Sequence, residues 1–150
     1  MATYSIANAI GFEAGSAAPS STGVWRCYLQ KVELDFAAII ADRAAAGATA
    51  LAAADLIEVL HIPARSQLLA AGATVTSVES TATTGTFDVG DGDDPDGYAA
   101  LLANNALASE SNTTLGAKFY DAADTLDVTL GTAAPTDCVL EVWAVLADCS

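Results

Sequence analysis

Acidic residues gather in the stretch DVGDGDDPDGY, residues 88–98, which holds five of the nineteen acidic residues of the chain. Carboxylates this close repel each other by roughly 1 kcal/mol per pair at about 4 Å in water. The stretch must therefore be solvated, bind a cation or face a basic partner. Calcium takes carboxylate and carbonyl oxygens as ligands, so the candidate metal ligands of the chain are Asp91, Asp93, Asp94 and Asp96.

The spacing of this stretch departs from that of an EF-hand calcium loop. If Asp91 were the first ligand, Pro95 would stand at a ligand position and Leu102 would replace the bidentate glutamate. Asp-Gly and Asp-Pro pairs are also strong turn formers. We therefore expect a solvated loop leaving a strand, with no metal and no cofactor. Calcium, or a basic partner, is the alternative.

Other residues that could support catalysis are scarce. The single histidine, His61, lies in the apolar stretch DLIEVLHI, where a structural, hydrogen-bonded role is expected. Nucleophilic catalysis needs a base beside its nucleophile, and no pair of carboxylates stands out as a glycosidase pair. The chain has no GxxxxGK[ST] loop, and the acidic residues of GDGDDPDG would repel a dinucleotide pyrophosphate. We expect no enzyme activity.

The cysteines argue for a reducing compartment. Cys27, Cys138 and Cys149 are an odd number and lack the spacing of a zinc site. Cys138 and Cys149 lie on one expected strand, where a rise of about 3.3 Å per residue keeps them too far apart to bridge. We expect all three to be reduced and the protein to be made in a cytoplasm.

Composition excludes several classes of partner. The formal net charge is -14, which repels phosphate, so we expect neither nucleic acid nor a membrane as partner. No run of about 18 apolar residues marks a membrane helix. The first twenty residues lack the basic start of a secretory signal. A length of 150 residues fits one domain.

A period of two in hydrophobicity predicts strands along most of the chain. In the last strand, Trp143 shares one face with Glu141, while Leu140 and Val142 lie on the other, which should point to the core. Turn residues suggest that the third and fourth strands form a hairpin and that the last two form an antiparallel pair. The expected strands are residues 24–36, 55–62, 67–80, 83–91, 124–130 and 138–148.

Two alanine-rich segments, residues 37–55 and 97–111, leave helix and irregular structure equally open. Residues 1–23 contain apolar side chains in an irregular Gly/Ser/Ala context, so we expect an extended arm that orders against a neighbour. We therefore divide the chain into this arm and an all-β domain, residues 24–150: a single antiparallel sandwich or jelly-roll-like fold. The candidate partner-binding residues are Tyr4, Ile6, Ile10 and Phe12.

Three stretches carry a resemblance to a known class of proteins. FDVGDGDDPDGY follows a Thr/Val-rich strand, KFYDAADTLDVTL comes about twenty residues later, and VLEVWAVLADCS forms the hydrophobic last strand. This pattern resembles small virion proteins of tailed bacteriophages, marine ones in particular, over residues 55–150. The resemblance implies a head decoration or cement protein, a β-rich subunit on the outside of the capsid that clamps neighbouring major capsid proteins.

The expected partners are thus the major capsid protein and further copies of the chain, as a homotrimer, and the expected location is the outer surface of the virion. Two alternatives stay open. A tail or fibre component would share the β-rich, self-associating character but would stack head to tail. A cation-dependent surface binding module would use the acidic stretch together with Tyr98, the one aromatic near it in sequence.

Overall fold

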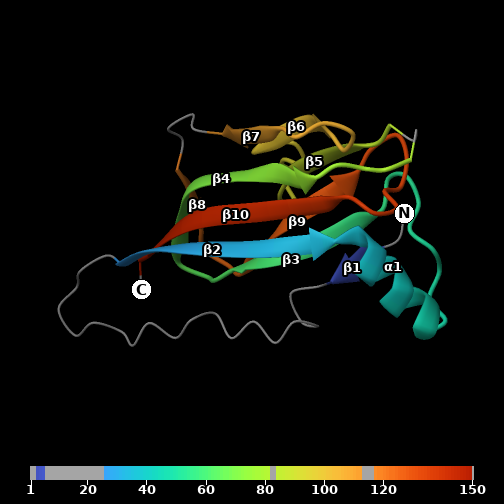
Figure 1. Ribbon diagram of the computed structural model, residues 1–150. Helices are drawn as coiled ribbons and strands as arrows, with labels where there is room; N and C mark the ends of the chain where they lie inside the picture. The colour runs from blue at the N-terminus through green and yellow to red at the C-terminus, as the bar shows by residue number, and fades with distance from the viewer. Residues whose placement is uncertain (1–2, 6–25, 82–83, 113–116, 150) are drawn as a thin grey trace.

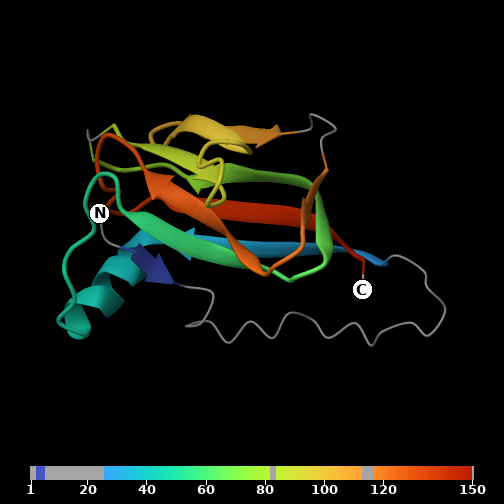
Figure 2. The same ribbon diagram turned by 180° about the vertical axis from the view of Figure 1, so that it is seen from behind.

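The computed structural model describes residues 3–5, 26–81, 84–112 and 117–149. Within them, ten strands form two stacked β-sheets, and one helix lies outside the sheets (Figures 1 and 2). All strand pairs are antiparallel except β1 with β3, which is parallel. The expected all-β sandwich is confirmed. No helix in this part of the chain is long and apolar enough to cross a membrane.

Each sheet is named here after its central strand. The β9 sheet has the order β1-β3-β9-β5-β6, with β1 Thr3–Ser5, β3 Leu56–Ile62, β9 Asp124–Leu130, β5 Thr86–Gly90 and β6 Ala99–Ala103. The β10 sheet has the order β2-β10-β4-β7, and β8 also pairs with β4. Its strands are β2 Arg26–Asp35, β10 Val139–Asp148, β4 Ser66–Ser77, β7 Ser109–Asn112 and β8 Lys118–Tyr120.

The core lies between the sheets and follows the alternation of each strand. On β10, Leu140, Val142, Ala144 and Leu146 are fully buried, whereas Glu141 and Trp143 are half-buried on the opposite face, as expected. Phe36 and Phe87 stack at the centre, with ring centroids 5.3 Å apart. Burying each large side chain contributes roughly 1.5–3 kcal/mol before ordering costs.

The two expected hairpins are wrong. β4 belongs to the β10 sheet and β5 to the β9 sheet, so residues 67–80 and 83–91 do not pair with each other. The same holds for β9 and β10, whose connection also crosses from one sheet to the other. Alternation fixes which face of a strand is buried but not which strand lies next to it, and an eight-residue connection is long enough to cross a sandwich.

The two alanine-rich segments behave differently. Residues 37–55 contain the helix α1, Phe36–Ala45, which begins where the Asp35 side chain accepts a hydrogen bond from the Ala38 N–H at 3.2 Å. Residues 97–111 instead contain β6 and most of β7. Pairing of β6 with β5 overrides the helical propensity of its alanines.

Most of the expected N-terminal arm lies outside the described residues. The exception is β1, whose backbone pairs with Leu56–Glu58 at the start of β3. Tyr4 is opposite Ile57 in this pairing, and Ile6, Ile10 and Phe12 fall outside the described part. The assignment of these four residues to partner binding stays a prediction.

Candidate functional site: an apolar face and a locked acidic loop

The acidic loop is organised around Asp91, which follows β5 and is only 2% exposed. Its Oδ1 accepts hydrogen bonds from the backbone N–H groups of Asp93 and Asp94 at 3.0 and 3.1 Å, which folds the loop into a turn. Gly90 permits this turn, because a Cβ there would collide with the backbone of Asp94 and Pro95. The sequence explains the turn but gives no sign that its first aspartate is buried.

A lysine from another strand neutralises this buried carboxylate. Lys118 Nζ, on β8, lies 2.9 and 2.8 Å from the two carboxylate oxygens of Asp91 and 3.0 Å from Asp93 Oδ2. The hydroxyl of Tyr120 also donates to Asp91, and the hydroxyl of Tyr98 does so at 3.3 Å. The cation that this loop holds is thus part of the chain.

Opposing effects set the pKa values in this group. Burial raises the pKa of Asp91, but hydrogen bonds from Lys118 and Tyr120 outweigh it and hold the pKa below its usual value. Burial lowers the pKa of Lys118, and its bonds to Asp91 and Asp93 more than reverse this, so that the pKa is raised. The pair therefore stays ionised at neutral pH.

The four candidate metal ligands do not converge. Asp91 and Asp93 share Lys118, while Asp94 and Asp96 are exposed. The described residues contain no group of three or more His, Cys, Asp or Glu side chains that could hold a metal ion. His61 is exposed on β3 opposite Thr125, and not in a buried structural role.

A second buried carboxylate lies on the same sheet without such a partner. Asp127, on β9, is 7% exposed, and its Oδ1 has no hydrogen-bond partner among the described residues. It lies between Glu58 of β3 and Gly90 of β5 in the strand register. Burial first, and then the charges of Glu58, Asp124 and Asp91, raise the pKa of Asp127 to about 6 despite a hydrogen bond from Thr125.

A third buried carboxylate joins the two connections that cross between the sheets. Glu79 follows β4 and accepts hydrogen bonds from the Thr136 N–H at 2.8 Å and from the Thr136 hydroxyl, just before β10. Thr81 donates to it as well, at 3.0 Å. Burial would raise the pKa of Glu79, but these hydrogen bonds outweigh burial and lower it to about 2.

The three cysteines lie in different environments. Cys27 is exposed, Cys149 is half-buried, and Cys138 is fully buried at the start of β10. Burial, with the charge of Glu79 added, raises the pKa of the Cys138 thiol to about 12.

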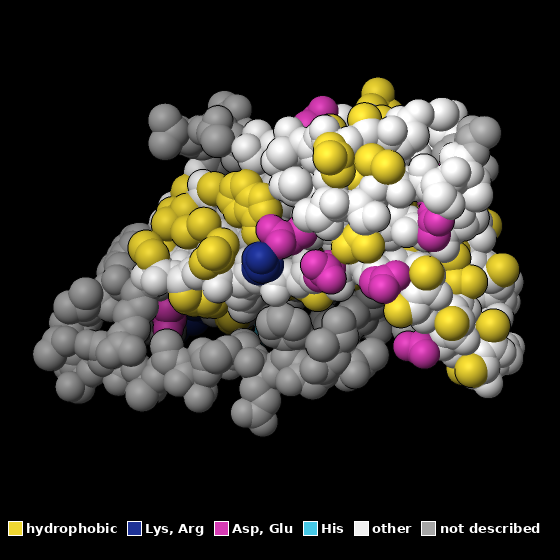
Figure 3. All heavy atoms as spheres, viewed as in Figure 1, with side chains coloured by type: hydrophobic (Ala, Val, Ile, Leu, Met, Phe, Trp, Pro, Cys, Tyr) yellow, Lys and Arg dark blue, Asp and Glu magenta, His cyan; other side chains and the backbone are white. Residues whose placement is uncertain are grey.

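The outer face of the β10 sheet carries a group of hydrophobic side chains that are exposed or half-buried. We call it the apolar patch, and it comprises Leu29 of β2, Leu69 of β4, Phe119 of β8, and Trp143 and Val145 of β10. Leu29 is 63% exposed, Phe119 53% and Leu69 38%. Figure 3 shows hydrophobic side chains gathered over one half of this face.

Strand register explains how residues far apart in sequence meet here. Val145 is opposite Leu29 on one side and Ala70 on the other, and Phe119 is opposite Gln67. A register shift in the pairing of β4 with β10 brings Leu69 out to the surface beside Ala70. Alternation alone places Trp143 and Val145 on the outer face, but only the strand order adds the other three.

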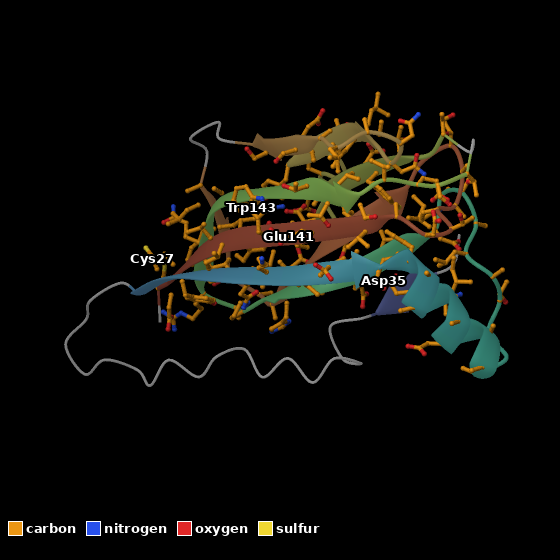
Figure 4. All side chains as sticks on the ribbon, in the orientation of Figure 1. Cys27, Asp35, Glu141 and Trp143 are labelled. Atoms are coloured by element: carbon orange, nitrogen blue, oxygen red, sulfur yellow. The ribbon has the colours of Figure 1, made fainter. Side chains whose placement is uncertain are left out.

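Charged residues border the patch. Lys31 Nζ lies 2.6 Å from Glu141 Oε2 across β2 and β10, next to Trp143. In Figure 4, Trp143 and Glu141 are neighbours along β10, with Cys27 and Asp35 marking the two ends of β2. The outer face of the β9 sheet, on the opposite side of the sandwich, carries Glu58 and Asp88, which are half-buried, and the buried Asp127. Acidic residues also lie on the outer face of the β10 sheet beside the patch, at Glu33 and Glu141. Acidic residues thus occur on both outer faces.

No family model and no curated protein matches the chain. Solved structures do. A chain of the cyanophage Pam1 capsid asymmetric unit matches with a TM-score of 0.58 at 16% identity, covering 88% of this chain and 91% of that one. A chain of the Ralstonia phage GP4 capsid matches with a TM-score of 0.51 at 15% identity, covering 87% and 88%.

A chain from the acidic stable capsid of the Helicobacter pylori bacteriophage KHP30 matches with a TM-score of 0.50 at 10% identity, covering 85% of this chain and 95% of that one. At these identities the likeness concerns the fold. The described chain therefore has the same fold, over nearly its whole length, as chains found in three bacteriophage capsids.

Proposed function

We propose that this chain is a structural subunit of a phage capsid, of the decoration or cement type, and that it binds the outer capsid surface and stabilises contacts between major capsid proteins. The shared fold supports a capsid-related role. The observation that carries the decoration role is the apolar patch on a chain with a formal net charge of -14.

The two faces of the sandwich suit a subunit with one bound side and one solvated side. Leu29 and Phe119 leave most of their apolar surface in water, and exposed apolar patches of this kind mark interaction sites. A partner that covers the patch gains roughly 25 cal/mol per Å² of buried apolar surface. The outer face of the β9 sheet, with Glu58 and Asp88, would then face outward.

The finer parts of the proposal follow from the sequence. The partners are the major capsid protein and further copies of the chain, with a homotrimer as the expected assembly, and the protein is made in the host cytoplasm. It carries no catalytic activity and binds neither nucleic acid nor membrane. A tail or fibre component, which would form tubes by head-to-tail stacking, is distinguished by negative-stain microscopy of the purified protein.

The experiment measures the occupancy of the chain on phage capsids assembled without it. The variant Leu69→Ser with Phe119→Ser removes two patch residues on β4 and β8 and leaves β2 and β10 unchanged. We expect binding at least about tenfold weaker, a loss of ~1.4 kcal/mol that is modest for interface side chains.

The matched control is Leu107→Ser, which removes a leucine that is 73% exposed in the connection between β6 and β7. It should bind like the wild type. Equal occupancy for the patch variant and the control would refute the assignment of this face to capsid binding.

A further inference from the structure

The strand β2 has an open edge. It forms one border of the β10 sheet and pairs, among the described residues, with β10 alone (Figure 1). Its ten pairs with β10 run from Arg26 to Asp35 with no shift in register, whereas the pairing of β10 with β4 shifts twice. β2 is therefore a long and regular strand, one side of which is unpaired within the described part of the chain.

The hydrogen-bond pattern shows which residues turn their backbone to that side. The Phe36 N–H donates to the Cys138 carbonyl at 3.2 Å, and these two residues continue the register in which Asp35 is opposite Val139. In an antiparallel pair, hydrogen-bonded and non-hydrogen-bonded residues alternate. The even-numbered residues of β2 thus bond to β10, and Cys27, Leu29, Lys31 and Glu33 direct their N–H and C=O groups to the open edge.

Sheet edges are commonly protected by short strands, charged side chains, prolines, bulges or inward-pointing charges. β2, with the sequence RCYLQKVELD, is long and has no proline and no register shift against β10, so its protection consists of charged side chains such as Lys31 and Glu33. The edge strands of the other sheet differ: β1 has three residues, and β6 has five with an irregularity in its pairing. The amide of Gln30, on the inner side of β2, adds a buried Oε1 without a partner among the described residues.

We propose that β2 pairs antiparallel with β2 of a second copy of this chain, about a two-fold axis. The same strand is a suitable partner because odd residues meet odd residues, so each outer face stays outward and the two apolar patches join through Leu29. Antiparallel pairing also places the two α1 helices at opposite ends of the joined strands. β2 carries both Lys31 and Glu33, charges of opposite sign, so the strand adds no net charge to the repulsion between two acidic copies.

This inference deepens the proposed self-association and does not depend on capsid binding. A contact of an edge with itself joins copies in pairs. It joins single chains into dimers, or trimers into hexamers if a separate contact builds the expected trimer. A pair formed this way leaves the exposed part of each apolar patch on one continuous surface, available to a capsid.

The test uses the isolated full chain and a proline that removes an outward N–H. Lys31→Pro removes a donor from the open edge without removing a bond to β10, and prolines are tolerated on the open side of edge strands. Lys31→Ala is the matched control, because it loses the same ion pair with Glu141 and keeps the N–H. Sedimentation equilibrium should show even-numbered assembly for the wild type and Lys31→Ala, and dissociation at least about tenfold stronger for Lys31→Pro.

A spin label gives an independent readout if Lys31→Pro fails to fold. With Cys149→Ser, a nitroxide on the exposed Cys27 should show coupling between copies, and a nitroxide at Leu107→Cys with Cys27→Ser should not. A monomeric wild type, equal association of the proline and alanine variants, or uncoupled Cys27 labels would overturn the proposal. The capsid occupancy of Lys31→Pro should stay within severalfold of that of the wild type. A failure of the proposed β2 pairing can therefore be distinguished from a failure of the proposed capsid binding.

Discussion

The buried carboxylate of Asp127, whose Oδ1 has no hydrogen-bond partner among the described residues, should destabilise the protein at neutral pH, and Asp127→Asn should relieve this. The pKa of Asp127 in the folded protein is about 6, against an ordinary value of 3.8, because burial and the charges of Glu58, Asp124 and Asp91 disfavour its charged form. A shift of roughly 2 units corresponds to about 3 kcal/mol of differential stability. Asparagine has nearly the same shape without the charge, so we expect it to raise the free energy of unfolding at pH 7 by about that amount.

The direction of the change in the pKa of Asp127 sets the pH range in which stability changes. Since the pKa is higher in the folded protein, protons favour folding, so the stability linked to Asp127 is fully present below pH 3.8 and is lost as pH rises to about 6. The advantage of Asp127→Asn over the wild type should therefore fall below about 1 kcal/mol at pH 4. Titrating groups that do not interact with Asp127 are common to both proteins and cancel in this difference.

Urea unfolding at pH 7 and pH 4, with linear extrapolation, measures both values. Asp96→Asn is the matched control, because it removes an exposed aspartate of the acidic loop, and it should change stability by less than about 0.5 kcal/mol at either pH. If Asp127→Asn did not stabilise the protein at pH 7, or stabilised it equally at pH 4, the assignment of a raised pKa to this buried carboxylate would be wrong.

Three further predictions can be tested on the purified protein. Lys118→Met should cost about 3–5 kcal/mol in urea unfolding, because it leaves the buried Asp91 without its counter-charge; Lys31→Met, which breaks an exposed pair, should cost about 1 kcal/mol or less. Glu79→Gln should lower the free energy of unfolding by about 2–3 kcal/mol at pH 7, because the ionised Glu79, with its pKa lowered to about 2, stabilises the fold. This contribution is fully present above pH 4.5 and is lost as pH falls toward 2. Alkylation of the denatured protein without reductant should label three thiols, with Cys138 labelled only after unfolding because it is fully buried; a stoichiometric disulfide would contradict the expected reducing compartment.

The sequence predicted six of the strands but not their neighbours, and it missed β1, β6, β7 and β8. Alternation placed the buried and exposed faces of β10 correctly because side-chain direction along a strand is a local property. It could not show that β4 and β9 each lead into a strand of the other sheet, because that choice depends on contacts made far away in sequence. Glu79 is one such contact, 57 residues from its partner Thr136.

The candidate site was predictable to a similar degree. The stretch around Asp91 suggested a turn loop, and the turn is there, but its counter-ion Lys118 lies 27 residues away on another strand, and nothing in the sequence indicates that the two side chains meet. Two of the five members of the apolar patch, Trp143 and Val145, could be predicted from the alternation of β10. Its other members come from β2, β4 and β8, which only the strand order brings together.

Cryo-electron microscopy of the intact virion whose genome encodes this chain is the most direct test of the decoration role. We predict density for the sandwich on the outer capsid surface, with the apolar patch of the β10 sheet against the major capsid protein and the outer face of the β9 sheet facing solvent. Density for the chain in the tail or fibres, or on the capsid with Leu69 and Phe119 exposed to solvent and the β9 sheet at the interface, would contradict it.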